Sequence, residues 1–260
     1  DRDPDISPHA TAIVQPGGDL RIFQRNWDHL VAVENQVKDE TRRSFQVFDA
    51  QGHAVHKIWL RDGSDVAAFE VIVADLALDD PAPVEFDTPA PAAPKERSSE
   101  VDRDGLLDAW SKLEHTHDFF RLMGRFDVTR TEALEIAEGR YTRPLDRGVA
   151  TPLLEGAAER GIEIMAFVGN EGCIQIFSGK VHRIVPMDEW TNVMDPGFNL
   201  HLAQGGVDRA WAVTKPTAYG DIHSVELYAE DGSTIVSFFG LRKEGSDVAE
   251  GWAELVAELA

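Results

Sequence analysis

Apolar residues along this chain follow a helical period in its middle third and an alternating period in most of the remainder. After Asp102, apolar positions recur every three or four residues, which predicts an amphipathic helix. The stripe of that helix comprises Leu106, Trp110, Leu113, His117 and Phe120. A second helix is predicted to begin at Thr129, with Glu132 completing a capping box, and to stop near Gly139. A third is predicted from Thr151, with Pro152 at its first position, to Gly161.

Strands are predicted for most of the chain after Gly161, where β-branched and aromatic residues form short runs between turn residues. The runs are IEIMAFV, CIQIFS, VHRIV, FNLHL, AWAVT, HSVELY and TIVSFF. A closing helix is predicted from Asp247, with Trp252, Leu255, Val256 and Leu259 on one face. Helices gathered before a large antiparallel sheet indicate the α+β class.

Two β-rich parts of the chain resemble each other. FQVFDAQGHAVHKIWLRDGSDV (45–66) aligns with VELYAEDGSTIVSFFGLRKEGSDV (225–248). LRIF and WDHLVAV (20–33) match LHLA and VDRAWAV (200–213) at the same spacing of about 180 residues. We therefore predict a duplicated fold with large antiparallel sheets and helices packed beside them. The first copy is incomplete, because nothing before Gly17 matches the helices and hairpin that precede the second copy. Either it was trimmed or it starts outside this sequence, which begins with Asp rather than Met.

The segment 81–102 is rich in Pro, Ala and charged residues and has no apolar period, which indicates an exposed linker. We expect a partial N-terminal repeat at residues 1–80, the linker at 81–102 and a complete C-terminal repeat at 103–260.

Composition narrows the functional classes. The 46 acidic and 25 basic residues give a formal charge of −21, which repels nucleic acid and anionic lipid. The single cysteine, Cys173, excludes an internal disulfide and covalent haem attachment through CxxCH. The sequence has no apolar run long enough to span a bilayer and no signal-peptide pattern at its start. We expect a cytoplasmic protein without membrane insertion.

Two histidines near the first helix are candidates for ligand chemistry. His115 and His117 are two residues apart, so on a helix they point about 200° away from each other and cannot share one metal. His117 belongs to the apolar stripe, whereas His115 lies with the charged face. On pattern alone, a buried histidine of this kind is more typical of a core side chain than of a ligand. Basic residues at predicted element ends stand out in so acidic a chain, and composition does not distinguish them from surface cations: Arg21, Arg130, Lys215 and Arg242.

Five ordered blocks, WSKLEHTHDFF, IMAFVGNEGCIQIFSG, MDPGFNLHL, WAVTKPT and SFFGLRK, resemble the bacterial cytoplasmic haemin-uptake family of HemS and haemin-degrading factor. DLRIFQRNW and FDAQGHAVHKIWLR extend the resemblance into the first copy. The resemblance implies a duplicated α+β fold with haem, bound non-covalently, in a cleft between the repeats. The chain departs from the family pattern at Phe177, where relatives often have His, and at Val236 and Ser237.

The resemblance also implies roles for particular residues. The histidine of the family's DTHxF-type motif falls on His117, as the axial iron ligand. The family's distal arginine falls on Arg21, with Phe23 two residues on along the same strand face against the porphyrin. The propionate-holding residues correspond to Arg130, Lys215 and Arg242, and Phe167 corresponds to a residue that packs on the ring.

The function that this resemblance implies is a cytoplasmic haem carrier. It would receive haem from an ABC importer and pass it to storage, breakdown or a haem oxygenase. The alternative is an enzyme that cleaves the haem ring, with Arg21 as a catalytic residue that stabilises developing negative charge. A third possibility is an interaction module without a cofactor. The sequence does not separate carrier from enzyme, because both use the same pocket.

Overall fold

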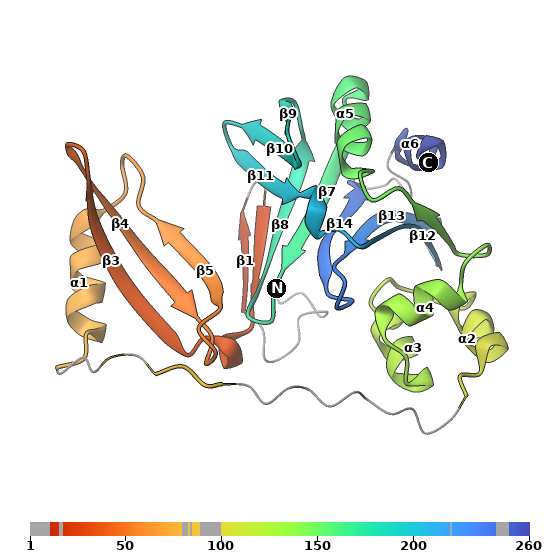
Figure 1. Cartoon of the computed structure of the whole chain (residues 1–260), viewed down its shortest axis with the longest axis horizontal. Helices are drawn as coiled ribbons and strands as arrows, with labels where there is room; N and C mark the ends of the chain where they lie inside the picture. Colours follow the sequence, from red (N-terminus) through yellow and green to blue (C-terminus); the bar gives the residue numbers. More distant parts are fainter. Residues whose placement is uncertain are drawn as a thin grey trace. The chain divides into compact units, whose positions relative to one another are not determined.

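The computed structural model describes residues 11–15, 18–79, 83, 85–88, 100–218, 220–242 and 250–260 (Figure 1). It confirms the α+β class. The described part of the chain divides into two compact units, the first built mainly from residues 20–79 and the second from residues 100–169 and 175–260. The short turn at 170–174 belongs to the first unit. Most of the predicted linker lies outside the described residues.

The elements of the N-terminal part are β1 (Thr11–Gln15), β2 (Gly18–Ile22), the 3-10 turn η1 (Gln24–Asn26), β3 (His29–Val37), β4 (Glu40–Phe48), β5 (Ala54–Trp59) and α1 (Val66–Leu76). The next elements are α2 (Arg103–Trp110), α3 (Asp118–Phe126), α4 (Arg130–Ile136), β6 (Thr142–Leu145), α5 (Ala150–Arg160), β7 (Glu163–Gly169) and β8 (Cys173–Lys180). The last are β9 (Ile184–Met187), β10 (Trp190–Asp195), β11 (Phe198–Ala203), η2 (Gln204–Gly206), β12 (Arg209–Thr217), β13 (Gly220–Tyr228), β14 (Thr234–Gly240) and α6 (Trp252–Glu258).

The described strands form three sheets. The largest has eight strands in the order β1-β2-β8-β7-β14-β13-β12-β6, and two three-stranded sheets have the orders β11-β10-β9 and β3-β4-β5. Strand β10 was not predicted from the sequence. It pairs with β9 and β11, both of which were predicted.

The predicted duplication is confirmed by β3-β4-β5 and β12-β13-β14. Each set follows a 3-10 turn, η1 or η2, and its first two strands have nine residues each. The register shifts between Val47 and Phe48 in one copy and between Leu227 and Tyr228 in the other. The turn glycines Gly52 and Gly232 have φ of 85° and 84°, a left-handed conformation that glycine adopts without strain. The copies therefore share their turns and irregularities as well as their strands.

The predicted long helix from Leu106 to Phe120 is wrong, because α2 ends at Trp110 and α3 begins at Asp118. The Asp118 side chain accepts a hydrogen bond of 2.9 Å from the backbone N–H of His115, which closes a turn that competes with helix. Its negative charge also suits the first turn of α3. Phe119, rather than Phe120, enters the core, and Phe120 is 69% exposed. The buried stripe through His117 therefore does not exist, and His117 is exposed immediately before α3.

The other helix predictions are close to the structure. The capping box of Thr129 and Glu132 is present, although α4 ends at Ile136 rather than near Gly139. Helix α5 begins at Ala150 with Val149 as its N-cap, so the predicted cap at Thr151 and first position at Pro152 are two residues late. It ends at Arg160, and Gly161, with φ of 64°, is the left-handed cap that the sequence predicted. Helix α6 buries Trp252, Leu255 and Val256, and the predicted start at Asp247 lies outside the described residues.

The central sheet of the second unit has a different core on each face. Helices α5 and α6 lie on one side of β13 and β14, and α2, α3 and α4 lie on the other (Figure 1). Alternate residues of β13 point to opposite faces, so Val225 and Leu227 join the core beneath α5 and α6. Ser224, Glu226 and Tyr228 face the helices α2–α4. Three polar side chains of this strand, Ser224, Glu226 and Tyr228, are thereby gathered on one buried face.

Replacing Thr129 by Ala removes the side-chain acceptor for the N–H of Glu132 and should lower the free energy of unfolding by about 1 kcal/mol. Thr129→Ser keeps the hydroxyl and is the matched control. Urea unfolding followed by circular dichroism measures both variants. Equal stability of the Ala and Ser variants would contradict the capping role.

Candidate functional site

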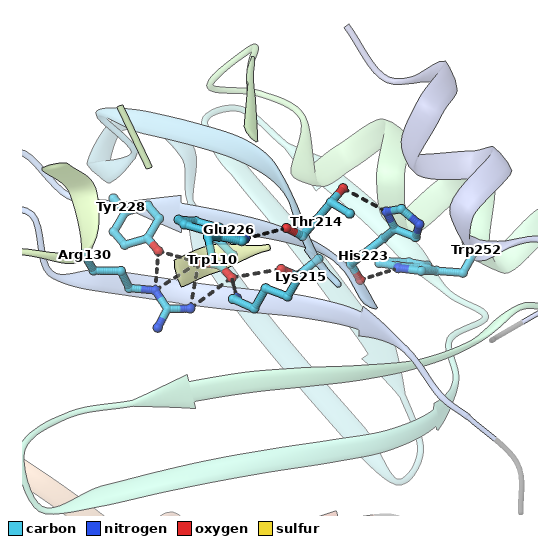
Figure 2. Close-up of polar contacts among 9 residues, drawn as sticks. Trp110, Arg130, Thr214, Lys215, His223, Glu226, Tyr228 and Trp252 are labelled. Carbon is cyan, nitrogen blue, oxygen red and sulfur yellow. Dashed lines mark hydrogen bonds and ion pairs between the residues drawn. The ribbon is translucent and has the colours of Figure 1, made fainter. Parts of the chain in front are cut away.

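A buried carboxylate, Glu226 on β13, lies at the centre of a charged cluster in the second unit (Figure 2). Its side chain is 0% exposed and faces two cations. Lys215 Nζ on β12 donates to Oε1 at 2.9 Å, and Arg130 Nη2 at the start of α4 donates to Oε2 at 2.8 Å. The two cations predicted separately from the sequence therefore meet at one anion that sequence reasoning missed.

Neutral groups complete the coordination of Glu226. The Tyr228 hydroxyl donates to Oε2 at 2.5 Å, and Ser224 Oγ donates to Oε1 at 2.8 Å. Arg130 Nε also donates to the Tyr228 oxygen, at 2.7 Å. With Arg130 and Lys215 positive and Glu226 negative, the cluster carries one net positive charge.

Burial and charge oppose each other at these groups. Burial by itself raises the pKa of Glu226, but the positive charges of Arg130 and Lys215 outweigh it and hold that pKa well below its ordinary value. Burial lowers the pKa of Lys215, and the charge of Glu226 opposes that shift. Burial also raises the pKa of Tyr228, and the neighbouring carboxylate raises it further. Glu226 is therefore ionised, and Tyr228 is a neutral donor.

Aromatic rings enclose the two cations. The Phe119 ring centre lies 4.9 Å from Lys215 Nζ and 5.3 Å from Arg130 Cζ, within the range of cation–π attraction. The Phe239 ring is 6.0 Å from Lys215 Nζ, and Phe167 packs edge-on against Phe239 at 5.3 Å. His117 precedes Phe119 by two residues. The apolar rings thus contact the two cations directly, and the exposed His117 lies close to Phe119 in the sequence.

Backbone contacts hold Lys215 in place. The carbonyl oxygen of the preceding residue, Thr214, accepts a hydrogen bond of 3.0 Å from Trp110 Nε1 (Figure 2). The Thr214 hydroxyl lies 3.1 Å from His223 Nδ1. Trp252 Nε1 donates to the carbonyl oxygen of His223 at 2.9 Å. Strand β12 is therefore fixed to α2, and β13 to α6, on either side of the cluster.

The remaining predicted site residues lie elsewhere. Arg242 is exposed beyond the end of β14 and is not among the partners of Glu226. Arg21 is partly buried in β2, and with Phe23 it belongs to the first unit. The strand that was predicted to continue through Phe23 ends one residue earlier, at Ile22. Phe23 is the residue before the turn η1, and its N–H donates to the carbonyl oxygen of Gly172 at 3.0 Å.

The three departures from the family pattern have structural roles. Phe177 stacks on Phe198 with ring centres 3.8 Å apart, so it contributes apolar packing. Val236 is buried in the core under α5 and α6, on the face away from Glu226. Ser237 is the cross-strand partner of Glu226, so only the second of these two β14 positions faces the site.

A signal for Glu226 is present in the sequence. It is the one acidic residue in the predicted strand HSVELY, and period-two alternation places it on the same face as Ser224 and Tyr228. A carboxylate that shares a strand face with hydroxyl groups and is flanked by apolar residues indicates a buried, hydrogen-bonded anion.

Neither a metal cluster nor a membrane-spanning helix is found in the part of the chain that the structure describes. No three His, Cys, Asp or Glu side chains of the described residues come together as metal ligands. None of the described helices is both long and apolar enough to cross a bilayer.

Comparison with known proteins identifies the class. The family model for the haemin-degrading HemS.ChuX domain matches residues 4–76 and 127–259. The hemin transport protein HmuS of Yersinia pestis is 32% identical over 258 residues, which cover 98% of this chain and 73% of that protein. The hemin transport protein HemS of Yersinia enterocolitica is also 32% identical, over 256 residues.

Solved structures agree with this result. Holo-PhuS, a heme-binding protein from Pseudomonas aeruginosa, superposes with a TM-score of 0.91 at 38% identity, covering 100% of this chain and 76% of PhuS. ChuS, described as an E. coli heme oxygenase, has a TM-score of 0.84 at 33% identity, covering 98% of this chain and 76% of ChuS. The fold thus belongs to a class of α+β proteins that bind or transport haemin. The chain is a member of the HemS family.

Glu226→Gln should destabilise the protein at neutral pH by about 3 kcal/mol, because the buried Lys215 and the partly exposed Arg130 lose their counter-charge. A carboxyl whose pKa is lowered on folding stabilises the fold above its unfolded pKa and loses that contribution as pH falls. The stability difference between wild type and variant should therefore narrow as pH falls below the ordinary glutamate value of 4.5.

Urea unfolding at a series of pH values measures this difference. Glu258→Gln, which removes an exposed carboxylate paired with Arg160, is the charge-matched control and should have a much smaller effect throughout. A difference in unfolding free energy between wild type and Glu226→Gln that does not change with pH would contradict the paired, ionised state of Glu226.

Proposed function

We propose that this chain binds haem non-covalently as a cytoplasmic haem carrier in bacterial haem uptake. The observation that carries this proposal is the grouping, within one unit, of the exposed His117, the rings of Phe119, Phe167 and Phe239, and the cations Arg130 and Lys215. Haem needs these three kinds of partner: an imidazole for iron, apolar walls for the porphyrin and cations for the propionates.

The donor set fits haem residue by residue. His117 is exposed before α3, and a histidine imidazole is a common axial ligand of haem iron, so His117 is assigned as the single axial ligand. Arg130 is 24% exposed and is clamped by Glu226, which suits a guanidinium that anchors a propionate. Lys215 is the buried cation of the same cluster and pairs with Glu226. Arg242 adds an exposed cation beyond the end of β14. When bound, haem supplies an iron centre that can take a further ligand.

The carrier role is supported by relatives described as hemin transport proteins and by the chemistry of a single histidine ligand. One non-covalent axial bond can be exchanged, so haem can be received from an ABC importer and passed to a haem oxygenase. Attachment through thioether bonds would prevent that transfer, and the sequence lacks the motif for it.

Haem degradation is the second candidate, because ChuS, 33% identical to this chain, is described as a heme oxygenase. In this alternative Arg21 is the catalytic residue. Its guanidinium would stabilise negative charge that develops during ring cleavage, and Phe23 would pack against the porphyrin.

His117→Ala should weaken haemin binding at least about tenfold and shift the Soret band, because the iron ligand is lost. His115→Ala should leave both unchanged and is the matched control, since His115 is also exposed and lies in the same turn. Absorbance titration with haemin measures both variants. Equal losses in the two variants would remove His117 as the specific ligand.

Arg21→Ala should reduce turnover more than haemin affinity if the chain degrades haem. The test adds ascorbate to the haemin complex in the presence of catalase and follows Soret bleaching together with release of iron. Bleaching with iron release in wild type, slowed several-fold in Arg21→Ala, would favour the enzyme. A stable Soret band in wild type would favour the carrier.

A further inference from the structure

We propose that Glu226 is an internal counter-ion that weakens the carboxylate site at Arg130 and Lys215, so that the site holds one ligand carboxylate reversibly. The inference rests on the proposed function, in which that carboxylate is a haem propionate. Glu226 would then be a specificity-determining residue that does not itself contact the ligand.

Burial separates the tasks of the two cations. Lys215 is 3% exposed and Glu226 is 0% exposed, so their 2.9 Å ion pair is enclosed. Arg130 retains an exposed fraction of 24%. Lys215 therefore holds Glu226 from within, and Arg130 is the cation that reaches the surface of the cluster.

The orientation of Arg130 leaves one edge for a ligand. Its Nε and Nη2 atoms donate to Glu226 and Tyr228, and Figure 2 shows the remaining guanidinium nitrogen pointing away from Glu226. A guanidinium clamped on one edge presents its other N–H groups in a fixed direction, which favours pairing with a carboxylate. The net charge of the cluster, one positive unit, matches one such carboxylate.

The first copy of the repeat shows that the fold does not need the negative charge at this position. Gln46 lies about 180 residues before Glu226 in the same place on the equivalent strand. Its Nε2 lies 3.2 Å from the hydroxyl of Ser44, as Glu226 lies 2.8 Å from that of Ser224. The residue equivalent to Lys215 is Asn35. The copy without the carboxylate is thus also without this lysine, and the charges occur together as a unit.

The charge balance gives the expected direction. Removing the charge of Glu226 leaves Arg130, and Lys215 for as long as it keeps its proton, without an internal counter-charge, which strengthens the attraction of the cluster for a ligand carboxylate in a weakly screened environment. In Glu226→Gln, the preference for haemin over its dimethyl ester, in which both propionates are neutral, should rise about tenfold. Glu258→Gln removes the same charge from the exposed pair with Arg160 and should leave the preference at its wild-type value.

A double variant tests this charge balance without leaving the enclosed Lys215 beside an uncharged partner. Lys215→Met combined with Glu226→Gln restores one net positive unit on Arg130, so the preference should return to about the wild-type value. If Lys215 rather than Arg130 meets the propionate, the preference falls below wild type, and the inference is overturned.

A readout without haem separates this inference from the proposed function. At equal ionic strength, replacing chloride by acetate should raise the Tm of Glu226→Gln more than that of wild type or Glu258→Gln, because acetate supplies the missing carboxylate. Absence of this extra gain overturns the inference whether or not haem binds. A different outcome is that wild type binds haemin and its dimethyl ester equally well while the acetate effect is present. That result overturns the anchoring of a propionate but supports the role of Glu226 as counter-ion.

Discussion

The burial of one carboxylate constrains the second unit of this protein. An unpaired buried charge costs several kcal/mol, so Glu226 requires partners, and they come from three elements. Arg130 must extend from the start of α4, Lys215 from β12, and Tyr228 from β13, the strand that also carries Glu226. Helix α4 consequently lies on this face of the sheet, with α2 and α3 packed beside it. The position of His117 before α3 follows from that arrangement.

One ring, Phe119, belongs both to the core of the second unit and to the charged cluster. Phe119 lies over both cations and is 1% exposed, so it belongs to the core and to the wall of the site. Because His117 lies two residues before Phe119, the segment that carries the proposed iron ligand is anchored by the cations that are proposed to meet the propionates. The proposed carrier and the alternative ring-cleaving enzyme can both use this cluster. The two proposals differ in whether Arg21 has a catalytic role.

Duplication supplied two copies of one scaffold, and they have diverged in charge and packing. Their strands, 3-10 turns and register shifts coincide, yet Glu226 and Lys215 stand where the first copy has Gln46 and Asn35. Helix α6 buries three residues of its apolar face, whereas α1 buries Phe69. The second copy therefore contains the charged chemistry on a scaffold that the first copy maintains without it.

The sequence by itself determined the elements whose signals are local. The alternating strands, the repeat, the Thr129 capping box and the left-handed end of α5 depend on neighbouring residues, and the structure has each of them. The helical period wrongly predicted a continuous helix between Trp110 and Asp118. The Asp118 side chain closes a turn there, and the spacing of apolar residues does not indicate that turn. Arg130 and Lys215 could be selected by resemblance to the family. Their convergence on Glu226 required the pairing of β12 with β13 and the docking of α4, which join residues up to 96 positions apart. Only tertiary structure decides such contacts, because the energy of a buried ion pair depends on distances between elements that no local pattern encodes.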